Sequence, residues 1–574
     1  MKRITTSISS RNIDQAVIPL FLATFTFLLL FALRASEQIS DGLAYASSVK
    51  MGAAFHPHHL SFLPIIHLFA RGFCSAGVSC DVIFVAQIHN IMWSVVSVVA
   101  FYFLARKLVA SNPVGLLAAL CLLCSQGFWI LSSQVEPYIP TFGCVMLLTA
   151  ILMLRGDADL HVAGILGVSL LLAMAVLYHQ ASVLFCIPMG YYLLATQSRQ
   201  RWRTPLAVFS LGGMMVLSAY VLTFLLTRDA RTPGDFLRWL TMYVHHPNPD
   251  WGTFAHFSVT GLYQLFVSQS WAIVNASGIQ ITYDFASVML VLLFLAFFTW
   301  NILQVARRAA HAKIRCFSLI WLVTYYVYFL WWLPSEWKFF ILTLIPIILL
   351  ALITLKDAAD AICQSEWARR ILMLVIATLA IIVLLAANTQ VVLPLHQSRG
   401  QSYDEASALA TIASPGCFFC VGYSVQGNLL YYFGVDRSYE IILGLLAFYQ
   451  GESFDALPQL EREQCIIVPL FYVVPSFDAV GFNGYSQPSE WLGFTEWLFG
   501  FRYGSPGNLV ACREFQVITE EKTGQTYVLM SSSPAEVDGL GELFEMLDSK
   551  ISQSSGQQTD EFQRWLSTAY ESHQ

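Results

Sequence analysis

The chain has 574 residues, of which 56% are hydrophobic and only 12% are charged. Soluble domains carry about 25% charged residues, so this composition, with a mean hydropathy of +0.60, excludes an ordinary soluble protein and predicts an integral membrane protein. The small net charge of −6 and the lack of a long basic run argue against nucleic acid as a partner.

Apolar runs of membrane-spanning length recur along the first 393 residues. A spanning helix needs about 20 apolar residues, and the shorter runs require tilt, local thinning or a shared re-entrant turn. The first run follows a basic N-terminus and is longer than a usual signal-peptide core, so we expect an uncleaved signal anchor. About eleven spans are predicted, at 17–33, 82–105, 114–131, 138–154, 162–178, 181–196, 206–226, 285–305, 316–333, 339–355 and 371–392.

Lysine and arginine predict the orientation of these spans, because basic residues concentrate in cytoplasmic loops. With the N-terminus inside, the basic loops alternate regularly along the chain. They lie at 106–107, 155, 199–203, 307–315 and 356–370.

Segment 254–274 is moderately apolar, but a span there would move the 307–315 basic cluster to the outside. We therefore expect it to form a helix that lies on the membrane surface. The large outer segments are then 35–81, 227–284 and everything after residue 393.

The part after residue 393 has the composition of a soluble protein. Apolar runs at 418–423, 441–446 and 465–474 alternate with turn residues, which predicts an α/β domain at 394–548 and a flexible polar tail at 549–574. The predicted fold class is thus an α-helical polytopic membrane protein with a C-terminal soluble α/β domain.

Cysteines are consistent with this sidedness. Six of the twelve fall in outer segments, where an oxidising compartment permits disulfides. Cys74 and Cys80 form the best local pair. The spacing of Cys417 and Cys420 permits zinc or redox chemistry, but no second CxxC or histidine pair follows, so structural cysteines are the prediction there.

Polar residues of the first outer loop are candidates for chemistry, because ionisable groups near lipid are costly and often functional. Asp41 precedes Tyr45 by four residues, so the two share a face if this stretch is helical. A carboxylate held at the membrane surface beside an aromatic ring suits a general base, although Asp41 could simply cap a short helix. His56, His58 and His59 follow and are candidates for substrate contacts, with interfacial packing or a divalent metal as alternatives.

Further candidates lie in three tight outer turns: Glu136, then His179, then Glu336 with Lys338. Lys338 is the single cation of its turn, and it either reaches the headgroups or pairs with the phosphate of a lipid carrier. The plainer alternative for Glu136 and His179 is an ordinary polar turn residue. Inside the second span, the pair His89-Asn90 predicts hydrogen bonds between helices.

These features resemble the GT-C class of membrane glycosyltransferases, in particular protein O-mannosyltransferases and aminoarabinose transferases. The motif is Ser40-Asp41-Gly42-x-x-Tyr45, followed by Gly52-x-x-x-His56-Pro57. The resemblance implies that Asp41 acts as catalytic base or positions the acceptor, with Glu136 as the second acid. His179 stands where family members commonly carry a basic residue for the donor phosphate, which shifts this role towards Lys338.

The function implied by the resemblance is transfer of a sugar from a polyprenyl-phosphate-linked donor at the extracytoplasmic face, in a bacterial inner membrane. Lipid, protein and polysaccharide acceptors all remain open, and no cofactor is certain. The main alternative is a transporter or flippase of a lipid-linked substrate, and a third is a non-catalytic membrane assembly protein. The charges gather at one face and no internal repeat is visible, which favours the enzyme.

Overall fold

The computed structural model describes residues 10–36, 38, 40–50, 52, 55–196, 202–227, 232–241, 252–274, 283–307 and 311–397, together with five strands beyond residue 417. The chain divides into two compact units, Met1–Ser398 and Arg399–Gln574. The predicted tail at 549–574 lies outside the described residues.

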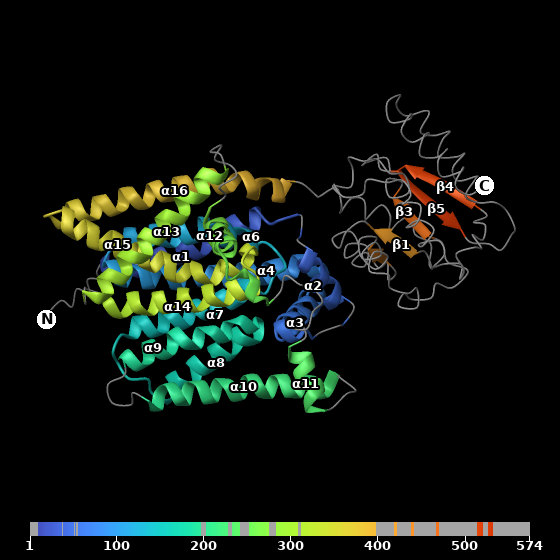
Figure 1. Cartoon of the computed structure of the whole chain (residues 1–574), viewed down its shortest axis with the longest axis horizontal. Coiled ribbons are helices and arrows are strands. Elements are labelled where there is room, and N and C mark those ends of the chain that lie inside the picture. The colour runs from blue at the N-terminus through green and yellow to red at the C-terminus, as the bar shows by residue number, and fades with distance from the viewer. Residues whose placement is uncertain are drawn as a thin grey trace, which may run out of the picture. The chain divides into compact units, whose positions relative to one another are not determined.

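Long helices that run side by side build the first unit (Figure 1). Their sequences are apolar on almost every face, as expected for helices that face either lipid or other helices. The long helices and their direct continuations are α1 (Ser10–Ala32), α4 (Val82–Val109), α5 (Asn112–Cys124), α6 (Gln126–Ser132), α7 (Tyr138–Arg155), α8 (Val162–Tyr178), α9 (Cys186–Thr196), α10 (Arg203–Thr227), α13 (Tyr283–Ala306), α14 (Ala312–Trp332), α15 (Leu344–Ile362) and α16 (Glu366–Gln397).

The number of helices that could cross a membrane by length and composition is six within the described residues, or seven if the bent pair α5 and α6 is one span. This is fewer than the predicted count of about eleven. The remaining four predicted spans are helical, but their apolar stretches in the described residues are only 10–17 residues long. Those stretches are Ala16–Ala32, Val162–Tyr178, Gln180–Thr196 and Leu292–Ala306. The chain is an integral multi-pass membrane protein.

The basic loops meet at one end of the helical unit. Lys107, at the end of α4, donates to the carbonyl of Met153 near the end of α7 at 3.0 Å. Lys313, at the start of α14, pairs with Asp157 just after α7 at 3.0 Å. Loops that are far apart in the sequence therefore share one face, as the alternation of charge predicts.

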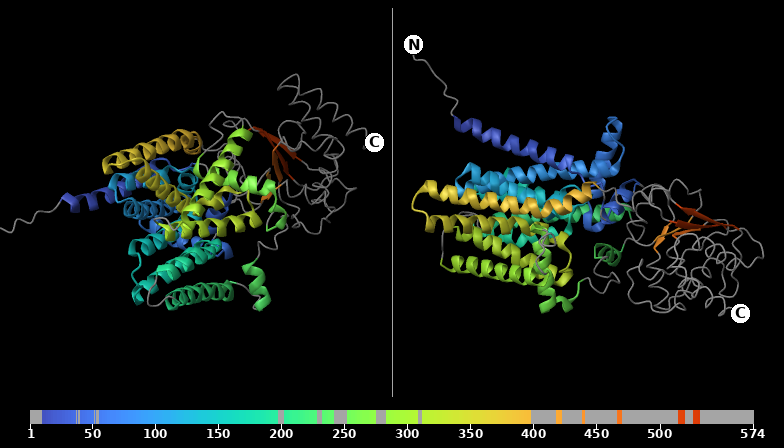
Figure 2. Two further views of the ribbon diagram at one scale, coloured as in Figure 1. Left: turned by 60° about the vertical axis from the view of Figure 1, so that its left-hand side comes forward. Right: turned by 90° about the horizontal axis from the view of Figure 1, so that it is seen from above.

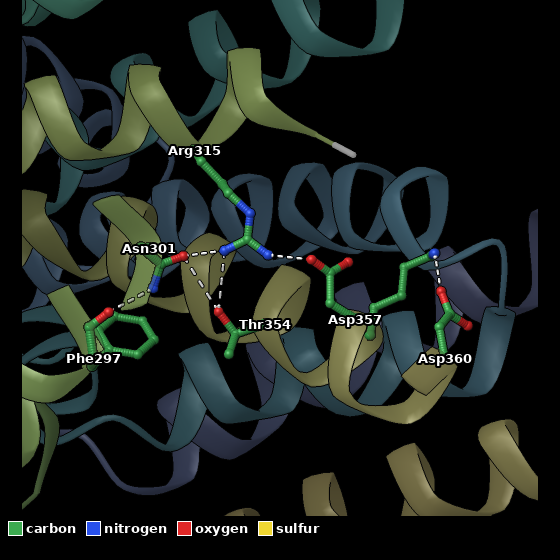
Figure 3. Close-up of polar contacts among 7 residues, drawn as sticks. Phe297, Asn301, Arg315, Thr354, Asp357 and Asp360 are labelled. Carbon is green, nitrogen blue, oxygen red and sulfur yellow. Dashed lines mark hydrogen bonds and ion pairs between the residues drawn. The ribbon is translucent and has the colours of Figure 1, made fainter. Parts of the chain in front are cut away.

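A buried charge cluster joins α13, α14 and α15 at this same end (Figure 3). The side chain of Arg315 is fully buried and donates to Asp357 Oδ2 at 2.6 Å. Its other terminal nitrogen contacts Asn301 and lies 3.4 Å from Thr354 Oγ1. A buried guanidinium needs such partners, because an unpaired charge costs several kcal/mol to desolvate.

Segment 254–274 forms the short helix η3 (Phe254–His256) and then α12 (Val259–Ile273). Most of its exposed residues are apolar, among them Val259, which is 85% exposed. Three polar residues in its second half, Ser268, Gln269 and Ser270, are buried. Gln269 Oε1 accepts a hydrogen bond from Tyr326 Oη at 3.0 Å and another from Thr343 Oγ1 at 2.5 Å. The expected surface helix thus packs its polar side into the bundle, because the amide finds hydroxyl partners there.

Short helices cover the opposite end of the unit: α2 (Ser40–Lys50), η1 (Pro57–His59), α3 (Phe62–Ser75), η2 (Gln180–Phe185), α11 (Pro233–Leu240) and η5 (Trp337–Thr343). Figure 2 shows the helical unit from two further directions. The predicted disulfide between Cys74 and Cys80 is formed and closes the loop after α3.

The described part of the second unit is a five-stranded mixed sheet in the order β2-β1-β3-β5-β4. β1 is parallel to β2 and β3, and β5 is antiparallel to β3 and β4. β1 and β3 coincide with two predicted apolar runs, whereas the run at 441–446 lies outside the described residues. The strands are β1 (Phe418–Val421), β2 (Ser438–Glu440), β3 (Ile466–Pro469), β4 (Glu514–Thr519) and β5 (Thr526–Ser531).

Candidate active site

Asp41 lies in the first turn of α2, where the positive end of the helix dipole favours a carboxylate. Its side chain is 49% exposed, and its Oδ2 accepts a hydrogen bond from Lys338 Nζ at 2.7 Å. Lys338 is the second residue of η5, 297 residues further along the chain. The two loops in which the sequence places these residues therefore meet in a direct ion pair.

Glu136 lies behind this ion pair, in the turn between α6 and α7. Its side chain is completely buried, and its Oε1 is 4.0 Å from Lys338 Nζ. Neither of its carboxyl oxygens has a hydrogen-bond partner among the described residues. Glu336 flanks the same lysine, since its Oε1 accepts from the backbone N–H of Lys338 at 3.3 Å.

Burial raises the pKa of Glu136 to about 8, against the opposing effect of the Lys338 ammonium. The negative charges of Asp41 and Glu336 add to the rise. Glu136 therefore holds a proton near neutral pH, and Lys338 pairs chiefly with Asp41.

Aromatic rings form one wall of the site. His56 and His59 stack with ring centroids 5.3 Å apart, and the ring of Tyr45 stands edge-on to His59 at 5.3 Å. His179 lies 4.9 Å from His59 and 4.8 Å from Tyr138. Histidines that are 120 residues apart in the sequence thus share one cluster.

Hydrogen bonds fix the tautomers of two of these rings. The Nδ1 of His59 lies 3.2 Å from the carbonyl of Tyr178, so it carries the proton and donates. The Nδ1 of His179 accepts from the backbone N–H of Ala181 at 3.2 Å, which leaves the proton on Nε2. His59 therefore offers Nε2 as an acceptor, and His179 offers Nε2–H as a donor.

These histidines are uncharged at neutral pH. Burial lowers the pKa of His56 and His179 to about 4 and that of His58 to about 3. Burial also lowers the pKa of His59 well below its usual value, and the neighbouring histidines lower it further. The cluster therefore supplies neutral hydrogen-bonding groups and no second cation.

A cavity of about 180 Å³ connects these groups. Its apolar side comes from the end of α14 and from η5, through Phe329, Trp332 and Phe339. The predicted site residues that line it are Asp41, Tyr45, His58, His59, His179, Glu336 and Lys338. Glu136 and His56 adjoin this set through Lys338 and through His59.

A divalent metal has no evident site here. No group of three or more His, Cys, Asp or Glu side chains is arranged to hold a metal in the part of the chain that the structure describes.

Two buried amides on α4 hold the backbone around the acids, and only Asn90 was expected to form such hydrogen bonds. Gln87 Nε2 donates to the carbonyls of Ala35 at 2.7 Å and Ser133 at 2.8 Å. Asn90 Nδ2 donates to the carbonyls of Gln134 and Glu136, both at 2.8 Å. The signal for Gln87 was present in the sequence: it is a second amide, three residues away, in an otherwise apolar helix.

Gly42 permits the close approach of α2 to the turn that carries Glu136. A Cβ at this position would lie 3.0 Å from the carbonyl oxygen of Val135, tighter than side chains normally pack. The motif Ser40-Asp41-Gly42 therefore combines a carboxylate with the small residue that lets its helix reach the second acid.

One segment matches a known protein family. Residues 56–225 match the model described as dolichyl-phosphate-mannose-protein mannosyltransferase. The segment contains the histidine cluster and Glu136, whereas Asp41 and Lys338 lie on either side of it. No curated protein matches the chain.

Solved structures match nearly the whole chain. ArnT from Cupriavidus metallidurans, bound to undecaprenyl phosphate, is 12% identical with a TM-score of 0.55, covering 91% of this chain and 99% of that chain. The apo form of the same protein is 12% identical with a TM-score of 0.52, covering 91% of this chain and 98% of that chain. The oligosaccharyltransferase of Archaeoglobus fulgidus, in complex with Zn and sulfate, is 12% identical with a TM-score of 0.49, covering 88% of this chain and 72% of that chain. A TM-score this low supports no argument. At 12% identity the likeness to ArnT shows a shared fold.

The ArnT-like fold and the mannosyltransferase-family segment make this chain similar to the membrane glycosyltransferases of the GT-C class. Within that class, the chain is similar to the dolichyl-phosphate-mannose-protein mannosyltransferases and to ArnT. The transporter and assembly-protein alternatives gain no support from these comparisons.

Proposed function

We propose that this enzyme transfers a sugar from a polyprenyl-phosphate-linked donor to an acceptor hydroxyl at the extracytoplasmic face of the membrane. The observation that carries the proposal is the ion pair of Lys338 with Asp41 at a cavity that contains no other cation among its described lining residues. The structure of ArnT bound to undecaprenyl phosphate supports a lipid phosphate as the group that this cation receives.

Lys338 is the group that we assign to the donor phosphate. An ammonium has three N–H donors, and Asp41 occupies one of them at 2.7 Å. As the bond between the sugar and the phosphate oxygen breaks, negative charge builds on the leaving phosphate, and a fixed cation stabilises that charge. Protonated Glu136 leaves the charge of Lys338 available, because a neutral acid does not compete with the phosphate.

Asp41 is the group that we assign to the acceptor. Its half-exposed side chain can reach an incoming hydroxyl, take its proton and so assist attack on the anomeric carbon. The new bond joins the acceptor oxygen to that carbon, the bond to the phosphate oxygen breaks, and the proton passes to Asp41. Donor binding draws Lys338 towards the phosphate, which frees Asp41 to act as a base.

The histidine cluster is assigned to the sugar. Neutral His58, His59 and His179 present both donors and acceptors, as hydroxyl groups require. Tyr45 and Glu336 complete the polar lining of the cavity, while His56 supports His59 from behind by stacking.

The orientation follows from the two ends of the helical unit. We assign the basic end to the cytoplasm, so the cavity faces outward; a bacterial inner membrane is what the resemblance implies. The disulfide between Cys74 and Cys80, in the outer segment 35–81, supports an oxidising side. On this basis residues 394–548 form an extracytoplasmic α/β domain.

The test is a transfer assay in proteoliposomes. Purified protein is given a polyprenyl-phosphate sugar with lipid, peptide or polysaccharide acceptors, and labelled product is measured. We expect sugar transfer to at least one acceptor class, with release of polyprenyl phosphate. Movement of the lipid-linked sugar across the bilayer without release of polyprenyl phosphate would replace the enzyme by a flippase.

A further inference from the structure

The turn that carries Glu136 is irregular backbone at the end of the bundle, and its carbonyls need donors from within the protein. Gln87 and Asn90 supply them. They lie three residues apart on α4, so they share one face of the helix, and they are 4% and 0% exposed. Each amide nitrogen has two hydrogens, and all four are used on backbone carbonyls.

The four carbonyls belong to the two segments that carry the acids. Ala35 lies in the connection that leads into α2 and Asp41, whereas Ser133, Gln134 and Glu136 form the turn itself. Gln87 therefore joins both segments through one side chain. Asn90 donates to the backbone carbonyl of Glu136 itself, so it holds the peptide that carries the buried acid.

Gln38 closes the arrangement from the side of α2. Its Oε1 accepts from the backbone N–H of Val135 at 2.9 Å, while its Nε2 donates to the carbonyl of Ala35 at 3.1 Å. Gly42 lets α2 lie directly against Val135. The backbone on both sides of the Asp41–Lys338–Glu136 group is thus tied to one rigid helix.

We propose that Gln87 and Asn90 are positioning residues of the transfer reaction, which hold Glu136 beneath Lys338 and opposite Asp41. The proposal rests on the proposed function for its kinetic consequence. A displacement of about 1 Å in a catalytic group costs up to about 100-fold in rate, and loss of the amide from Asn90 frees the peptide that fixes Glu136.

Asn388 offers a matched control. It is also completely buried, and its Nδ2 donates to two backbone carbonyls, those of Cys124 at 2.7 Å and Ile273 at 3.1 Å. It lies on α16 and holds neither acid-bearing segment. Asn388→Ala should therefore cost stability much as Asn90→Ala does, without the kinetic effect.

The kinetic experiment compares Asn90→Ala, Gln87→Ala and Asn388→Ala. We expect kcat to fall 10- to 100-fold in the first two variants, with the KM for donor changed less than twofold, and kcat to stay within twofold in the third. Asn90→Asp keeps the shape without the donors and should behave like Asn90→Ala. If Asn90→Ala fails to insert, Gln87→Ala carries the test. Wild-type kcat in the Gln87 and Asn90 variants would overturn the proposal.

A labelling experiment needs no activity and so separates this proposal from the proposed function. Dicyclohexylcarbodiimide modifies protonated buried carboxyls, and peptide mass spectrometry reports the yield at Glu136 as a function of pH. The charged or titratable groups around it are Asp41 on α2, Glu336 just before η5, Lys338 on η5, and Tyr138 on α7.

In the wild type, half-maximal labelling is expected near pH 8. In Asn90→Ala the midpoint should fall by one unit or more as water reaches the carboxyl, and in Asn388→Ala it should stay in place. A wild-type midpoint in Asn90→Ala contradicts the proposal even if sugar transfer is observed. A shifted midpoint in a protein that transfers no sugar leaves the positioning intact and removes the proposed function.

Discussion

Lys338 lies between two carboxyl groups of opposite character. Asp41 is half-exposed and 2.7 Å away, whereas Glu136 is completely buried and 4.0 Å away. A unit charge pair at about 4 Å gains roughly 4 kcal/mol near a protein surface, which does not repay the desolvation of a fully buried carboxylate that accepts no hydrogen bond. The lysine therefore stabilises the ionised form of Asp41 and leaves Glu136 protonated. A base and a protonated carboxyl thus lie beside one cation.

Replacement of Asp41 tests the base. Asp41→Asn keeps the shape and the hydrogen-bond acceptor but cannot take a proton, so kcat should fall by about 10²–10⁴, the usual contribution of general-base catalysis. Asp81→Asn is the matched control, because Asp81 caps the outer end of α4 and asparagine caps equally well. Transfer rates are measured in proteoliposomes. Equal rates for Asp41→Asn and the control would remove Asp41 from the mechanism.

Glu136 predicts a specific dependence of stability on pH. Its pKa in the folded protein is about 8, above its usual value of 4.5, so the folded state binds more protons than the unfolded state between these values. Stability therefore falls as pH rises from about 4.5 to about 8. Glu136→Gln removes this contribution, so its Tm in detergent should exceed that of the wild type by an increasing margin towards pH 8. Parallel Tm curves would show that Glu136 is ionised in the folded protein.

At the residue scale, the sequence predicted which turns carry the site residues, but it did not predict the contacts between those residues. Hydropathy and charge place Asp41, Glu136 and Lys338 at the same face of the membrane. The contact between Asp41 and Lys338 spans 297 residues, and nothing local encodes it. The backbone carbonyl of Glu136 accepts a hydrogen bond from Asn90, 46 residues away, so a pattern search could only treat Glu136 as a turn residue.

At the element scale, the approach of α2 to the turn after α6 depends on Gly42. Gly42→Ala places a methyl group 3.0 Å from the carbonyl oxygen of Val135, so α2 must shift and move Asp41 with it. We expect transfer activity to fall at least tenfold. Gly72→Ala is the control, since Gly72 lies in α3 with nothing within 4 Å of the added methyl, and alanine should stabilise that helix by about 0.5–1 kcal/mol. Similar activity of the two variants would refute the close-packing argument.

At the end of the unit away from the cavity, the packing of α13, α14 and α15 depends on Arg315 (Figure 3). Arg315→Ala leaves Asp357 and Asn301 without their buried partner, and breaking a buried pair costs about 3–5 kcal/mol. The Tm should fall markedly while the donor KM stays unchanged, because the cluster lies at the end of α14 away from the cavity. Lys313→Ala breaks the exposed pair with Asp157 and should cost at most about 1 kcal/mol. Equal Tm values for the two variants would contradict a structural role for the cluster.

Spans were predictable from the sequence where an apolar run forms one straight helix, as in α4, α10 and α16. The prediction was weaker where the backbone breaks. The run at 114–131 divides into α5 and α6, which are bent by 66°, and a hydropathy window averages over such a bend. The packing of α12 against the bundle was also not predictable, because the partners of Gln269 lie on α14 and η5, far away in sequence.

For the whole molecule, the two ends of the helical unit have different chemistry. α14 has 21 residues, about 32 Å at 1.5 Å per residue, which matches a hydrocarbon core of about 30 Å. Arg315 lies at its start, and Trp332 at its end lines the cavity. The same helix therefore separates the basic end from the site by about one membrane thickness. Under the proposed function, the donor phosphate would meet Lys338 from one leaflet only.

This separation predicts the sidedness of two exposed positions. Val78 precedes α4 at the end that carries the cavity, and it is 63% exposed. Trp202 precedes α10 at the basic end and is 70% exposed. With a membrane-impermeant maleimide on intact cells, Val78→Cys should label at once, and Trp202→Cys only after the membrane is permeabilised, each measured against the background of the native cysteines.

The labelling pattern decides more than the topology. Lys107 and Lys313 reach α7 and its following loop at the basic end, so reversal of the two labels would turn the whole unit over and place the cavity at the cytoplasmic leaflet. Sugar transfer would then draw on a donor in the inner leaflet, and the segment with the Cys74–Cys80 disulfide would lie in a reducing compartment. Labelling of both positions from one side would mean that the starts of α4 and α10 lie at the same end of the unit. That outcome would contradict the contact of Lys107 with α7 and the contact of Tyr220, near the end of α10, with Pro57 in η1.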